Sequence, residues 1–192
     1  MSHTIRKFMY FALISCLSSF TYAFPLNLQG TWKMPCDRGL SKTQDITADY
    51  SATTTESFFQ DALCTQESFR FQTVGSLSFN SDESMWINFA YEKVALTLFV
   101  PEVVQDFNSR AVCGLTNWSV GVSQTITGLQ CAMFNVNRPS QVPRVGDLKF
   151  GIYRIEDNQL YYGQLTLEKD GSTAEKRPNF FSPEFFIRKE VQ

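Results

Sequence analysis

The chain has 192 residues, 43% of them hydrophobic and 19% charged, and its only histidine is His3. Its 17 Lys and Arg residues stand against 19 Asp and Glu residues, with no basic run or stripe. This balance argues against a nucleic-acid surface, so no nucleic-acid partner is expected. The length is enough for one domain with its own hydrophobic core.

Residues 1–23 have the pattern of a signal peptide, which leaves residues 24–192 as a single exported domain. A cationic start precedes an apolar run at residues 8–20, which is too short to span a bilayer, and small residues lead to a cleavage site at Ala23. Cleavage there removes His3, and with it the imidazole that a Ser-His-Asp triad, a His-ligated zinc or a His-ligated haem requires. We therefore expect no enzyme, no cofactor and no metal.

A second processing site lies inside the leader. Leu13, Ile14, Ser15 and Cys16 have the form of a bacterial lipobox, whose cysteine is lipidated and becomes the first mature residue. Cleavage after Ala23 by the ordinary signal peptidase is favoured, because the apolar stretch before Cys16 is short and small residues precede the Ala23 site. The expected location is periplasmic or secreted; a lipid anchor in the cell envelope, and hence membrane contact, is expected only through Cys16.

The cysteines beyond the leader are even in number, which predicts two disulfides in an oxidising compartment. They are Cys36, Cys64, Cys113 and Cys131. Of the three pairings that four cysteines allow, we favour the sequential one because it closes two modest loops between neighbouring strands. No Cys-x-x-Cys pair occurs, which argues against a zinc ribbon or a thioredoxin-type site.

Apolar and polar residues alternate along most of the chain, which predicts short antiparallel strands. The first strand opens at Gly30, and Gly75 is expected to mark a bend or bulge within a long strand. Further strands are expected at residues 46–52, 69–79, 85–91, 94–100, 118–129, 148–154, 160–167 and around 185–187, with turns or loops at 80–83, 135–146, 156–158 and 170–178.

One short helix interrupts this pattern at residues 101–108. Pro101 suits a first helical turn, Glu102 suits a helix N-terminus, and Val103, Val104 and Phe107 form a helical stripe. Eight or nine short strands with one mid-chain helix predict an all-β fold, an antiparallel barrel or sandwich.

Several short motifs resemble those of lipocalins. Gly30, Thr31 and Trp32 are similar to the Gly-x-Trp motif at the first lipocalin strand, and Arg188 is similar to the arginine that ends the last strand. A further set is similar to the lipocalin-related barrel domain of the adenomatosis polyposis coli down-regulated family: Cys36, residues 59–64, Cys113-Gly114, Trp118 and Arg177-Pro178. The resemblance implies a lipocalin-like antiparallel barrel.

The sequence also departs from lipocalins. It lacks a Thr-Asp-Tyr type motif, and its helix lies mid-chain rather than after the final strand. A lipocalin-like relative is therefore favoured over a true lipocalin, and no ligand is carried over from the family.

Barrel closure is expected at Gly30 and Trp32. The glycine lets the backbone bend, and the indole supplies a large apolar plug. An arginine lying across the indole would gain about 0.5–2 kcal/mol of cation–π attraction. Arg188 is the first choice for that arginine and Arg177 the second.

Phenylalanine is abundant, with 18 in the chain, and an eight-stranded barrel can hold one small ligand. We expect a wall that is aromatic and uncharged, with a tyrosine hydroxyl orienting a polar end of a small apolar ligand or lipid. The candidate wall residues are Tyr50, Phe69, Phe71, Phe89, Tyr91, Phe150 and Tyr162. The alternative is a filled barrel that acts as a protein-interaction module and binds an envelope protein.

Overall fold

The computed structural model describes residues 26–79, 85–133 and 139–189. The signal peptide expected at residues 1–23, with His3 and Cys16, and the turn expected at residues 80–83 lie outside the described residues.

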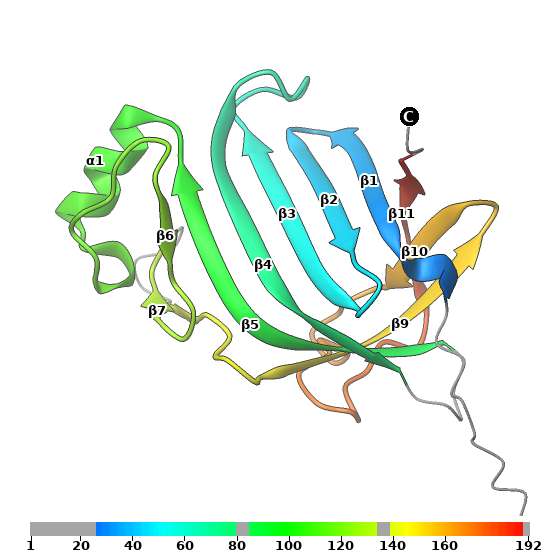
Figure 1. Cartoon of the computed structure of the whole chain (residues 1–192). Coiled ribbons are helices and arrows are strands. Elements are labelled where there is room, and N and C mark those ends of the chain that lie inside the picture. The colour runs from blue at the N-terminus through cyan, green and yellow to red at the C-terminus, as the bar shows by residue number, and fades with distance from the viewer. Residues whose placement is uncertain (1–25, 80–84, 134–138, 190–192) are drawn as a thin grey trace, which may run out of the picture.

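An antiparallel ring of eight strands forms the body of the protein (Figure 1). In chain order the ring strands are β1 (Gly30–Asp37), β2 (Leu40–Ile46), β3 (Ser51–Phe59), β4 (Glu67–Phe79), β5 (Trp86–Leu98), β9 (Leu148–Glu156), β10 (Gln159–Gly163) and β11 (Phe181–Arg188). Each strand pairs with the next one in this order, and β11 returns to β1. The all-β barrel that the alternation predicted is confirmed.

The chain between β5 and β9 forms an insertion beside the ring. It contains α1 (Pro101–Ser109), the short helix η2 (Val112–Gly114), β6 (Ser123–Thr125), and a small pair of strands, β7 (Gln130–Cys131) and β8 (Ser140–Gln141). The helix predicted at residues 101–108 is confirmed, with Pro101 in its first turn. β6 pairs with the second half of β5 and extends the sheet to nine strands on the side where α1 lies (Figure 1).

Disulfides join Cys36 to Cys64 and Cys113 to Cys131, as the sequence predicted. The first ties β1 to the loop after β3, and the second ties η2 to β7 within the insertion. Two disulfides indicate an oxidising location, periplasmic or extracellular. Among the described residues, no helix combines the length and apolar character needed to cross a membrane.

Trp32 plugs one end of the ring. Its side chain is fully buried, and its Nε1 donates a hydrogen bond to the carbonyl of Leu28 at 2.7 Å. The guanidinium of Arg188 lies 4.3 Å from the centre of the indole and donates to the carbonyls of Gln29 and Asn27. Gly30 has a φ of 118°, and a Cβ there would lie only 3.0 Å from Arg188 Nη1. Gly30, Trp32 and Arg188 therefore make the contacts that the sequence predicted for the closure of the barrel.

Arg177, the second choice for that role, lies elsewhere. Its guanidinium is 4.4 Å from the centre of the Trp86 ring, and it donates to Asn88 Oδ1 at 2.7 Å and to two backbone carbonyls of β5 and β9. Because Trp86 alternates with the inward-facing Ile87, this contact is on the outer face. Arg177 thus fastens the loop before β11 to the outside of the barrel.

Two hydrophobic clusters occupy different parts of the interior. The first surrounds Trp32 and includes Leu28, Ile46, Tyr50, Ala52, Ile87, Tyr153 and Leu160. The second joins the far half of β5 to α1 and the insertion through Val94, Leu96, Leu98, Phe107, Val112, Trp118 and Ile126.

Four strand predictions need correction. Residues 85–91 and 94–100 are not two strands, because both belong to the continuous strand β5. Residues 46–52 are not one strand, because β2 ends at Ile46 and a turn follows in which Tyr50 has a φ of 61°, outside the range of a strand. Within residues 118–129, only the three residues of β6 form a strand, because turns precede and follow it. The strand expected at residues 160–167 ends at Gly163.

Replacing Trp32 by Ala should destabilise the fold by roughly 3–5 kcal/mol, as expected for truncating a buried aromatic residue. The free energy of unfolding from denaturant titration measures this. Leu63→Ala is the control, because Leu63 is 82% exposed and its loss should change stability by less than about 0.5 kcal/mol. A loss below about 1 kcal/mol at Trp32 would show that the plug does not hold the ring together.

Peptide mapping without reduction should recover Cys36 cross-linked to Cys64 and Cys113 cross-linked to Cys131. The experiment requires protein folded in its own oxidising compartment, because disulfides form there during folding. Free thiols at these positions, or crossed cysteine pairs, would contradict the connection of β1 to the β3–β4 loop.

Candidate functional site

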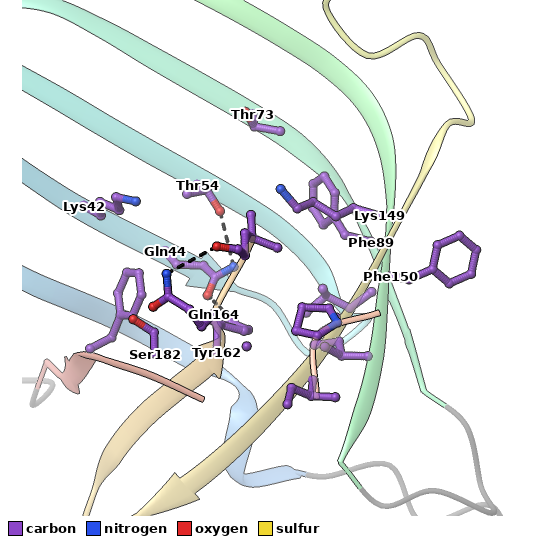
Figure 2. Close-up of a pocket in the computed structure, with 18 of the residues that line it drawn as sticks. Lys42, Gln44, Thr54, Thr73, Phe89, Lys149, Phe150, Tyr162, Gln164 and Ser182 are labelled. Carbon is purple, nitrogen blue, oxygen red and sulfur yellow. Dashed lines mark hydrogen bonds between the residues drawn. The ribbon is translucent and has the colours of Figure 1, made fainter. Parts of the chain in front are cut away.

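A cavity of about 490 Å³ lies inside the ring and opens to solvent. One wall comes from β2 to β5 and the other from β9 to β11 and the loops beside them. Its polar lining includes Lys42, Gln44, Thr54, Glu56, Thr73 and Lys149, and its apolar lining includes Leu77, Ile87, Phe89, Tyr91, Leu165 and Phe186. Figure 2 labels Gln44, Thr54 and Thr73 on the first wall and Lys149 and Tyr162 on the second.

A bulge shapes the wall made by β4 and β5. The register shifts between Val74 and Gly75, as the sequence predicted for Gly75. A Cβ at Gly75 would lie 2.1 Å from the carbonyl oxygen of Ala90 and 2.6 Å from the Phe89 ring. Only glycine permits this approach, so Gly75 lets the Phe89 ring lie over β4 and line the cavity.

A hydrogen-bonded chain of side chains crosses the interior from β10 to β3. The Tyr162 hydroxyl donates to Gln44 Oε1 at 2.5 Å, and Gln44 Nε2 donates to Thr54 Oγ1 at 3.2 Å (Figure 2). Burial raises the pKa of Tyr162, and its hydrogen bond with Gln44 offsets this only in part. Tyr162 therefore stays neutral and acts as a donor throughout the physiological pH range.

Charged side chains also face the cavity. Lys42 Nζ lies 3.0 Å from Glu56 Oε1, and these side chains are 25% and 35% exposed, so the pair is shielded from water only in part. Burial raises the pKa of Tyr91, and the nearby Glu56 and Asp147 raise it further. The expectation of an uncharged wall is wrong, because β2 places Lys42 on the same face as Gln44 and Ile46.

Lys149 enters the cavity from the opposite wall. Its side chain points inward beside Phe89, its register partner on β5 (Figure 2). Burial lowers the pKa of Lys149, while the negative charge of Glu56 acts in the opposite direction. Within the described residues, its ammonium has no ion-pair partner within 4.0 Å and no hydrogen-bond acceptor.

Three of the predicted wall residues line the cavity: Phe89, Tyr91 and Tyr162. Figure 2 shows the side chains of Phe89 and Tyr162 there. Phe150 belongs to the same wall, but its ring points away and lies 5.3 Å from the Arg177 guanidinium (Figure 2). Alternation explains this placement, because its neighbours Lys149 and Gly151 face inward.

The remaining three predicted residues lie outside the cavity. Tyr50 is buried in the cluster around Trp32. Phe69 and Phe71 pack against the cluster beneath α1, farther along β4 than the cavity. They occupy the inward face, but the inserted segment covers that end of the strand, which periodicity alone does not reveal.

The polar wall residues on β2 and β3 were missed by the sequence analysis. Lys42 and Gln44 lie four and two positions before buried Ile46 and therefore share its face, and this period-two spacing was the available signal. It was overlooked because β2 carries few apolar residues and its alternation is between polar types.

Tyr162→Phe should destabilise the protein by about 1 kcal/mol, because it leaves the Gln44 oxygen without its donor. Tyr161→Phe is the control from the opposite face of β10 and should cost less, since its acceptor Gln159 is only partly buried whereas Gln44 is buried. The contribution of Tyr162 to the free energy of unfolding is fully present below the ordinary tyrosine pKa of about 10. It is lost as the pH rises beyond that value, because the unfolded chain then releases the proton first. Equal unfolding energies for both variants at neutral pH would contradict the interior hydrogen bond.

The cavity is the candidate functional site. Among the described residues, no group of His, Cys, Asp and Glu side chains is arranged to hold a metal ion. No protein-family model matches this chain and no curated protein matches its sequence, so neither comparison assigns a family, a ligand or a reaction to the cavity.

Proposed function

We propose that this is an exported binding protein, a carrier or sensor that holds a small amphipathic molecule or lipid inside its barrel. The cavity of about 490 Å³ is the observation that carries the proposal. Ligand sites in proteins typically measure about 300–1,000 Å³ and combine an apolar lining with a few polar groups. The lipocalin-like motifs at Gly30, Trp32 and Arg188 agree with this role.

The lining accounts for an amphipathic ligand. Leu77, Ile87 and Phe186 form an apolar region next to the core around Trp32. An acyl chain buried there would gain about 0.8 kcal/mol per methylene, before association costs are subtracted. Gln44, Thr54 and Thr73 offer hydrogen bonds to a polar group, so one molecule can satisfy both regions.

The alternative is a cell-envelope module that binds a protein through its loops. That function suits a barrel filled by its own side chains, whereas the open volume favours a ligand. For the location, we propose the periplasm or the extracellular space after cleavage at Ala23. A lipid anchor at Cys16 is the second possibility, and intact mass spectrometry of the mature chain distinguishes the two.

We also propose binding rather than catalysis. Lys42 and Glu56 neutralise each other at 3.0 Å, and the Gln44 amide is hydrogen-bonded on both sides. Groups that are engaged in this way suit the positioning of a ligand rather than proton transfer to it.

Native mass spectrometry of protein purified from its own compartment should detect a bound small molecule. Thr73→Trp, which fills the cavity from β4, should abolish that signal and leave the fold intact. Thr55→Trp is the matched control, because Thr55 lies on the opposite face of β3 from Thr54. A chain without any bound molecule, or equal retention of the molecule in both variants, would contradict the proposed site.

A further inference from the structure

We propose that Lys149 binds the head group of the ligand and that this head group is a single carboxylate. The inference rests on the proposed binding function and specifies the chemical class of ligand as a monoanionic amphiphile.

The position of Lys149 is suited to this contact. Residue 149 pairs with Phe89 across β5 and β9, and its ammonium lies beside the Phe89 ring in the cavity that Thr73 also lines (Figure 2). A carboxylate beside this ammonium would accept a charge-assisted hydrogen bond, which is about twice as strong as a neutral one. The threonine hydroxyls at Thr54 and Thr73 provide donors in the same part of the cavity.

The carboxylates whose charges act on Lys149 already have other partners. Glu56 is paired with Lys42 at 3.0 Å, and Asp170 lies 3.6 Å from Lys176 Nζ. Glu184 also lines the cavity, but it is exposed on β11 and is not among the charges that affect Lys149. Lys42, Glu56 and Lys149 together therefore leave one uncompensated positive charge on this side.

The environment of Lys149 makes that charge costly. Burial is the main cause that lowers the pKa of Lys149; Glu56 and Asp170 offset this only in part, and the nearby Lys42 lowers it as well. A partly desolvated ammonium is stabilised when a counter-ion joins it. Because the described part of the chain supplies none within ion-pair distance, a ligand anion would complete the pair.

The neighbouring charges also limit the head group. A second negative charge on the ligand would meet the Glu56 carboxylate, which favours a monoanion over a dianionic phosphate ester. From Lys149, the apolar region at Leu77, Ile87 and Phe186 extends into the same cavity and can receive the hydrocarbon part.

Calorimetric titration with decanoate and with decanol tests the proposal, because the two probes differ only in the head group. Decanoate should bind the wild-type protein more tightly than decanol. Lys149→Met should lower the affinity for decanoate about tenfold or more and leave the affinity for decanol nearly unchanged. Lys149→Arg should retain decanoate binding, since it keeps the charge.

Lys93→Met is the matched control, because Lys93 is an exposed lysine on β5. It should leave the binding of both probes unchanged, and circular dichroism confirms that each variant is folded. Equal affinity of the wild-type protein for both probes, or unaltered decanoate binding by folded Lys149→Met, would overturn the anchor and leave the proposed binding function in place. Binding of neither probe would overturn the anchor as well, and together with an empty native mass spectrum it would overturn both proposals.

Discussion

The interior exists because the first and last strands meet at one narrow joint. β1 pairs in register with β11 at two positions, Trp32 with Arg188 and Lys33 with Ile187. Arg188 strengthens the joint, since it stacks on the indole and donates to carbonyls of the segment that precedes β1. A charged donor binds backbone carbonyls more strongly than a neutral one. Without this joint the other pairings would form an open twisted sheet that encloses no cavity.

Closing the ring has a chemical consequence, because it turns a polar strand toward the inside. On β2, Lys42 and Gln44 share a face with buried Ile46, so they enter the cavity when the ring forms. Buried polar groups require partners. Gln44 finds them in Tyr162 and Thr54, and Lys42 finds one in Glu56, whereas Lys149 has none among the residues that the structure describes. This incomplete pairing is the feature of the fold on which the proposed binding of an anion rests.

The parts of the structure that depend on local chemistry could be predicted from the sequence. Trp32 with its flanking glycine indicated closure, and Gly75 indicated a bulge because few other residues tolerate such close backbone approach. The cavity wall was harder to predict, because the face on which a side chain lies depends on the strand register, and its exposure depends on which segment covers the strand. Phe150 faces outward because it is one position out of phase with Lys149, whose side chain faces the cavity. The pattern of hydrophobic residues also gives little indication of which face of β2 lies inside, because most residues of this strand are polar.

A crystal structure of the mature protein, purified from its own compartment without added lipid, is the most direct test. We expect elongated electron density within the ring, with one end at hydrogen-bonding distance from Lys149 Nζ and the other against Leu77 and Phe186. A ring interior occupied by the protein's own side chains, or by ordered water alone, would contradict a barrel that holds an anionic amphiphile.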